Sequence, residues 1–302
     1  MNNITEAEQL FNPSPDDTAA SPSAPTRPVL LEAAHPFFHP AWAVFMAQVT
    51  PSAVASAKTS IWVPRGMFGY DDIRYNFELG GGAMMDLGAY TASTLTRIMG
   101  SVASECLSCE TAPGAAPADP RCDQLYKASY SFPNGAVGNM EGDLKTPVHR
   151  IMPKISVTHK PVEVTPAEAE VKAGEEGEQI LRTRNISFNN YPQPAIFHSI
   201  TVEDEFVVQR SGGGAAPTKT WKTKRTLKAY SWRESGLEGF EEQPGEVHWT
   251  TYRYQLEQFV NKVRGHDTPQ WVEGQASVAT MRMIDMAYAK ANLPVRPTSE
   301  YK

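Results

Sequence analysis

The sequence predicts an α+β fold, built as an open, mostly antiparallel sheet with covering helices. Between residues 100 and 230, runs of strand length alternate apolar and polar residues, which is typical of strands with one buried face. The triplet Pro133-Asn134-Gly135 separates two of these runs and indicates a hairpin. Two amphipathic helical segments follow the strands near the C-terminal end. Strands that follow strands, and do not alternate with helices, favour this fold class.

The first residues predict a short helix followed by a flexible segment. Thr5 and Glu8 have the spacing of a capping box, which predicts a helix from about Glu6 to Phe11. Residues 12–26 are rich in Pro, Ser and Ala and offer little to bury. We therefore expect a flexible surface insertion there.

The next segment predicts a strand and a helix. Val29–Ala33 is apolar enough for a buried strand, and His39–Val49 has helical spacing with a proline in its first turn. His35 and His39 are four residues apart with Glu32 nearby, which raises a metal hypothesis. Prolines after both histidines break the helical spacing that would make them converge, so a packed or capping role for His39 is favoured and no metal site is predicted.

Lys58–Val63 predicts a strand, and an aromatic-rich loop leads from it to the central stretch. This loop carries Arg65 and Arg74 and is placed to border a substrate cleft. The alternative is an aromatic loop that only packs on the sheet.

The stretch Leu79–Gly100 combines a backbone turn with a pair of proton-handling side chains. Gly80–Gly82 form a turn that only glycine tolerates freely, a helical segment follows, and Gly100 is placed to end it. Asp86 and Tyr90 are four apart and share one helix face, where a carboxylate and a phenol can position a substrate hydroxyl and relay its proton. The alternative is that the glycines only separate two structural elements, and that Asp86 lies in the first helical turn because the helix dipole favours a carboxylate there. No buried strand precedes Gly80, so a dinucleotide fingerprint is not supported.

The strands and helices after Gly100 are read from their periodicity. Leu125–Phe132 and Ala136–Glu141 flank the predicted hairpin. Further strands are expected at Ile151–Thr158, Gln179–Phe188, Ile196–Gln209 and Lys219–Tyr230, and helices at Thr251–Arg264 and Gln275–Asn292. The basic residues of the Lys219–Tyr230 run are expected on a solvated strand face.

Each C-terminal helix is assigned a core face from its apolar residues. These are Leu256, Phe259, Val260 and Val263 in the first helix and Val278, Met281, Ile284, Ala287 and Tyr288 in the second. With helices on one face, the other face of the sheet is expected to be apolar or partly so.

Composition excludes several function classes. The chain has 302 residues, 41% hydrophobic and 21% charged, as in ordinary globular proteins. The formal charge of -6 argues against a nucleic-acid partner, and no apolar run is long enough to span a bilayer. We expect a cytoplasmic protein. Cys106 and Cys109 form a C-x-x-C, but with three cysteines in all, buried reduced thiols are favoured over a metal or redox site.

Three blocks of this sequence resemble the Gfo/Idh/MocA oxidoreductases, in the branch of dimeric dihydrodiol dehydrogenases and NADP-dependent D-xylose dehydrogenases. They are, in order, VLLEAAHPFFHPAW from Val29, GGGAMMDLGAY from Gly80, and TTYRYQLEQFVNKVRG with SVATMRMIDMAYAKANLPVRP near the C-terminal end. The resemblance implies that Asp86 and Tyr90 are catalytic and that Arg74 and His39 contact the substrate. It also implies NADP or NAD as cofactor, a sugar or dihydrodiol as substrate, and a homodimer through the sheet face.

The chain departs from that family in one respect. The family's Glu-Lys-Pro motif, whose Lys completes the catalytic group, is missing, and so are the opening strands of the Rossmann domain. Residues 1–50 are then a βα remnant of the dinucleotide-binding domain, and residues 51–302 the substrate and dimerisation domain. We expect the chain as written to bind no cofactor tightly and to be inactive. The alternative function is a non-catalytic scaffold or dimerisation partner derived from such an enzyme.

Overall fold

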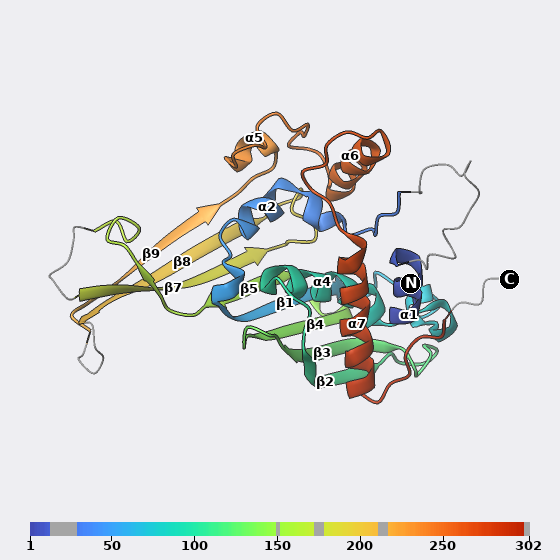
Figure 1. The fold of residues 1–302 in the computed structure, drawn as a ribbon. Helices are drawn as coiled ribbons and strands as arrows, with labels where there is room; N and C mark the ends of the chain where they lie inside the picture. The colour runs from blue at the N-terminus through green and yellow to red at the C-terminus, as the bar shows by residue number, and fades with distance from the viewer. Residues whose placement is uncertain (13–28, 149–151, 172–177, 211–216, 299–302) are drawn as a thin grey trace.

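One large sheet organises the chain. The computed structural model describes residues 1–12, 29–148, 152–171, 178–210 and 217–298, so residues 13–26 of the expected insertion lie outside the described residues. Nine strands form the sheet in the order β2-β3-β4-β1-β5-β7-β8-β9, with β6 paired to β7 (Figure 1). They are β1 Val54–Pro64, β2 Glu105–Pro113, β3 Asp123–Ser131, β4 Val137–Thr146, β5 Lys154–His159, β6 Val162–Val164, β7 Glu178–Asn189, β8 Ser199–Arg210 and β9 Lys219–Leu227.

The predicted α+β class, with a mostly antiparallel sheet and covering helices, is confirmed. Every neighbouring pair in the sheet is antiparallel except β1 with β4, which run parallel. The predicted hairpin joins β3 and β4: Gly135 has a φ of 78°, and its N–H donates to the Phe132 carbonyl oxygen. An L side chain would strain this turn, which explains the glycine.

Helices cover one face of the sheet. α4 and α7 cross it side by side, and α1 packs against α7 (Figure 1). The α-helices are α1 Ile4–Phe11, α2 Pro40–Met46, α3 Ala83–Asp86, α4 Gly88–Met99, α5 Trp232–Ser235, α6 Thr251–Val263 and α7 Gly274–Lys290. Short 3₁₀ turns are η1 His35–Phe38, η2 Pro51–Ala53, η3 Ile73–Tyr75 and η4 Phe77–Leu79. All five residues assigned to the core face of α7 are buried, as predicted.

The opposite face of the sheet is more polar than expected. Lys127 and Glu141 are cross-strand partners on this open face, and the Lys58 ammonium lies 2.7 Å from the Glu141 carboxylate. The alternation that places apolar side chains under the helices leaves mainly charged and hydroxyl side chains here. Strand β9 lies at the sheet edge and its basic side chains are exposed, as predicted, with Lys222 and Lys224 paired to carboxylates of β8.

Two N-terminal expectations are wrong in detail. Val29–Ala33 is not a strand, because none of the described strands lies beside it to complete a ladder. The cap of α1 is Asn3, whose side chain accepts from the Glu6 N–H, and not Thr5. Asn3 also donates to the Arg296 carbonyl oxygen, so a contact far along the chain fixes where α1 begins.

The core face of α6 is also different from the prediction. Leu256 and Val263 are 53% and 59% exposed, whereas Tyr254 and Gln258 are buried. The Tyr254 ring packs on Trp232 and Trp249, and its hydroxyl donates to backbone carbonyls. A large aromatic ring with a satisfied hydroxyl outweighs the aliphatic stripe in orienting this helix.

None of the helices that the structure describes combines the length and apolar character needed to cross a bilayer.

Candidate active site

Buried polar groups hold the glycine turn before α3. Gly82 has a φ of 132°, and a Cβ there would meet Arg296, Asp123 and Tyr288. Arg296 Nε donates to the Gly81 carbonyl oxygen at 2.7 Å, and the Tyr288 hydroxyl donates to Asp123 Oδ1 at 2.9 Å. Position 82 therefore requires glycine, both for its backbone conformation and for the space that this network occupies.

The glycine turn does not fit a dinucleotide phosphate. All three N–H groups of Gly80–Gly82 donate to backbone carbonyls of the preceding loop at 2.8–3.0 Å. The Asp123 carboxylate accepts from the Met84 N–H at 2.7 Å and so occupies the start of α3. Phosphate cradles need free backbone donors at a helix N-terminus, and here a carboxylate already takes that place. The turn thus positions α3 and offers no free backbone N–H group to a dinucleotide phosphate.

The structure brings the two predicted catalytic side chains to one pocket. Asp86 ends α3 and Tyr90 lies in the first turn of α4, because the single helix expected here breaks at Leu87. Both line a pocket of about 180 Å³, together with Met85, Ala89, Ser93 and residues 32–34. Gly88 follows the break and lies so close to the Met84 side chain that a Cβ would be crowded. Asp86 and Tyr90 line the same pocket although the helix breaks between them.

Arg74 is joined to the same site by an ion pair. Its Nε donates to Asp86 Oδ2 at 2.8 Å, and its Nη1 donates to Asp72 Oδ1 at 3.0 Å. The guanidinium lies 3.9 Å above the Phe68 ring centroid. Although partial burial acts to lower it, the pKa of Arg74 is raised by the two carboxylates. Arg74 thus fixes the orientation of Asp86.

Tyr90 lies in an environment that favours its neutral form. Burial raises the pKa of Tyr90 to about 12, and nearby Tyr252, Asp86 and Glu32 act in the same direction, with Arg74 opposing them. The ring meets His35 edge to face at 5.5 Å between centroids. At neutral pH Tyr90 is therefore a hydrogen-bond and proton donor and not a base.

His39, the fourth predicted site residue, lies apart from this pocket. Its side chain is fully buried, and Nδ1 accepts from the Ala41 N–H at 3.2 Å, which caps α2. Burial, reinforced by the nearby His198, lowers the pKa of His39 to about 3. The capping role that the sequence favours is the one the structure has.

Several polar residues of the site have no local sequence signal. Glu32 lines the pocket of Asp86 and Tyr90 and accepts a hydrogen bond from the Ser277 hydroxyl. In the sequence it stands out only as a neighbour of two histidines. Asp123 and Arg296, which hold the glycine turn, are 173 residues apart. The resemblance to the oxidoreductase family covers the segments of Glu32 and Arg296, and it is the only feature of the sequence that points to these two residues.

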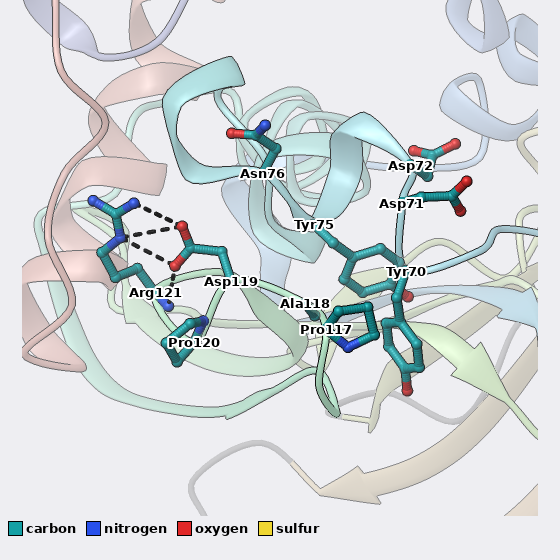
Figure 2. Close-up of a pocket in the computed structure, with 10 residues that line it drawn as sticks. All are labelled: Tyr70, Asp71, Asp72, Tyr75, Asn76, Pro117, Ala118, Asp119, Pro120 and Arg121. Atoms are coloured by element: carbon teal, nitrogen blue, oxygen red, sulfur yellow. Dashed lines mark hydrogen bonds and ion pairs between the residues drawn. The ribbon is translucent and has the colours of Figure 1, made fainter.

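A larger pocket of about 610 Å³ lies next to the loop that carries Asp71 and Asp72 (Figure 2). Asp72 belongs to its lining and so links the two pockets through Arg74. Figure 2 shows Arg121 bonded to Asp119 on one side and the rings of Tyr70 and Tyr75 on the other; all are lining residues. The aromatic-rich loop therefore borders a pocket, and its role as the border of a substrate cleft stays a prediction.

The surroundings of the three thiols suit a structural role, and the histidines near Glu32 belong to no cluster of metal ligands among the described residues. Cys106, Cys109 and Cys122 are free, and burial raises the pKa of all three thiols, that of Cys109 to about 12. Such thiols are poor nucleophiles at neutral pH. Within the described ranges, no group of three or more His, Cys, Asp or Glu side chains could hold a metal ion.

Comparison with known proteins finds likeness in structure alone. No family model and no curated protein matches this sequence significantly. Among solved structures, a 3-ketoreductase from Actinomadura kijaniata in complex with NADP and TDP-benzene is 12% identical, with a TM-score of 0.56 over 96% of this chain and 68% of that one. A levoglucosan dehydrogenase in complex with NADH is 13% identical, with a TM-score of 0.61 over 96% of this chain and 69% of that one.

An aldose-aldose oxidoreductase from Caulobacter crescentus, complexed with glycerol, is 15% identical with a TM-score of 0.53. Nearly the whole of this chain, 96%, aligns to 67% of that protein. The shared feature is the fold. The chain thus spans about two thirds of the length of these oxidoreductases.

Proposed function

We propose that this chain is the substrate-binding and proton-handling part of an NAD(P)-dependent oxidoreductase of the Gfo/Idh/MocA type, acting on a secondary alcohol of a sugar or dihydrodiol. One observation carries the proposal: Asp86 and Tyr90, predicted from the sequence motif, line a single pocket, and Arg74 is bonded to Asp86. The fold shared with ketoreductases and dehydrogenases over 96% of the chain supports it. We place the protein in the cytoplasm, which is consistent with its free cysteines.

In this proposal the residues of the chain hold the substrate hydroxyl. The Asp86 carboxylate, oriented by Arg74, accepts a hydrogen bond from that hydroxyl. Neutral Tyr90 donates to the same oxygen and is suited to protonate it when a ketone is reduced. Alcohol oxidation instead requires Tyr90 to accept the proton. With the pKa of Tyr90 raised to about 12, the phenolate fraction at pH 7 is only about 10⁻⁵.

We further propose that the described residues alone bind no nicotinamide cofactor tightly and do not turn over substrate. Two observations support this. The glycine turn offers no free N–H donors to a phosphate. No lysine or arginine lines the Tyr90 pocket, and the opposing effect of Arg74 still leaves the phenol pKa at about 12.

Ligand binding tests the proposal directly. Saturation-transfer NMR of the full chain is expected to detect a panel of aldoses and trans-dihydrodiols, and Asp86→Asn is expected to weaken their binding about 10-fold, since hydrogen bonds to charged groups contribute roughly that factor. Asp71→Asn is the matched control, because Asp71 lines only the neighbouring pocket. Equal losses in both variants, or no binding at all, would contradict the proposal. In parallel, NADPH fluorescence is expected to remain unchanged on addition of the protein.

We propose as a second candidate function a non-catalytic scaffold or dimerisation partner that uses the open sheet face; the raised pKa of Tyr90, which makes the phenol a poor proton acceptor, bears only on the absence of catalysis. In that case the chain binds no polyol and forms a homodimer. Polyol binding distinguishes the two functions, and light scattering after size exclusion, with Lys58→Glu as a variant that reverses one charge of the open face, tests whether that face forms the dimer. A dimer that the variant dissociates, without polyol binding, would support the scaffold.

A further inference from the structure

A second pocket lies beside the C-terminal end of α4. A pocket of about 460 Å³ is bounded by η1 and α2, by the C-terminal turn of α4 and by loops 237–240 and 269–272. Its size is typical of small-molecule sites. The apolar part of the wall comes from Phe37, Trp42, Met46, Phe240 and Trp271. A flat apolar group therefore has a complementary surface here.

One cation lines this aromatic pocket. The Arg97 guanidinium lies 4.3 Å above the Phe37 ring centroid. Its Nε and Nη2 are buried and have no hydrogen-bond partner among the described residues. Among the described residues no acceptor satisfies these two donors, so an anion beside the guanidinium would offset part of the cost of its burial.

The carboxylates nearby do not supply that anion. Glu32 favours the charged form of Arg97, but its carboxylate accepts from the Ser277 hydroxyl and forms no ion pair with Arg97. Glu238 lines the same pocket, is exposed, and also forms no ion pair with Arg97 in the part of the chain that the structure describes. Burial lowers the pKa of Arg97 to about 10, which still leaves the group charged at neutral pH.

We propose that this pocket binds a small organic anion with a flat apolar body, whose carboxylate pairs with the Arg97 guanidinium while the body lies among Trp42, Phe240 and Trp271. Arg97 is seven residues beyond Tyr90 on α4, so both lie on one side of the helix, two turns apart. The two pockets share no lining residue, so the anion site is distinct from the pocket of Asp86 and Tyr90 and does not depend on the proposed oxidoreductase function.

Calorimetry and tryptophan fluorescence test this with phenylacetate as the probe and phenylacetamide as its uncharged counterpart. Phenylacetate is expected to bind at least about 10-fold more tightly than phenylacetamide and to change the emission of the wall tryptophans. Arg97→Gln is expected to remove that preference, and Arg97→Lys to retain part of it because the charge remains. Arg65→Gln makes the same exchange at an exposed site and is expected to change nothing.

Equal affinity for the acid and the amide would overturn the proposal, as would a preference that survives Arg97→Gln. Binding of inorganic phosphate with the same affinity as phenylacetate would also overturn it, because the apolar body would then contribute nothing. Circular dichroism checks that each variant is folded. If Arg97→Gln does not fold, unchanged phenylacetate affinity in Arg97→Lys would count against the proposal, since lysine cannot reproduce the guanidinium fork.

Discussion

Replacing Arg296 with methionine is expected to lower the free energy of unfolding by about 3–5 kcal/mol, because it leaves a buried carboxylate without its cation. The side chains of Arg296 and Asp123 are both 0% exposed, and Nη2 lies 3.3 Å from Asp123 Oδ1. Nη2 also bonds to the Tyr288 hydroxyl and to the Gly81 carbonyl oxygen. The substitution therefore removes one partner from a network in which every other group has been withdrawn from water.

Urea unfolding followed by circular dichroism measures this loss. The matched control is Arg253→Met, which removes the half-exposed i,i+4 partner of Glu257 and its contact with the Trp249 ring, and which is expected to cost about 1 kcal/mol. Asp123→Asn combined with Arg296→Met is expected to recover part of the loss, since no buried charge then remains. Similar costs for Arg296→Met and Arg253→Met would show that the buried network contributes little.

Arg296→Met is also expected to weaken polyol binding, because the same network positions Asp86. Asp123 accepts from the Met84 N–H and Arg296 holds the Gly81 carbonyl oxygen, so together they fix the start of α3. Asp86 ends this four-residue helix. Because the helix is too short to hold its own shape, the position of the carboxylate depends on the network at its start.

Local pattern predicts the elements of this fold well. β3, β4 and the turn between them follow from alternation and from Asn134-Gly135, since both signals lie within a few residues. The buried face of α7 follows from its own spacing, because that helix packs along its whole length on the sheet and on α4. Asp86 and Tyr90 share a pocket because they lie four residues apart, and this survives the helix break between them.

Features that depend on distant partners are not predicted. α6 has an aliphatic stripe that faces outward, because Tyr254 finds carbonyl acceptors at Tyr230 and Glu246 on the other side. The segment Val29–Ala33 has the composition of a strand but no neighbour to pair with. Composition and spacing report what a segment can do, whereas pairing and burial depend on what the rest of the chain places beside it.

Acidification from pH 7 to pH 5 is expected to lower the free energy of unfolding by about 4 kcal/mol, through two buried histidines. Burial lowers the pKa of His35 to about 4, and burial together with His198 lowers the pKa of His39 to about 3. In the unfolded chain both titrate near 6.5. Below that pH the unfolded state takes up protons that the folded state does not, so stability is lost as pH falls from about 6.5 toward 4 and 3. At pH 5 each histidine contributes about 2 kcal/mol of this loss.

Urea unfolding at a series of pH values between 5 and 8 measures this dependence, and His39→Asn isolates the share of one histidine. Asparagine retains an acceptor for the Ala41 N–H that caps α2, but it does not titrate, so the variant is expected to lose about 2 kcal/mol less between pH 7 and pH 5. His248→Asn is the matched control, because His248 is exposed. Burial also lowers the pKa of His159 and His198, so further loss in the same direction is expected. A stability that is constant from pH 7 to pH 5, or a His39→Asn curve parallel to that of the unsubstituted protein, would show that His39 accepts a proton in the folded state.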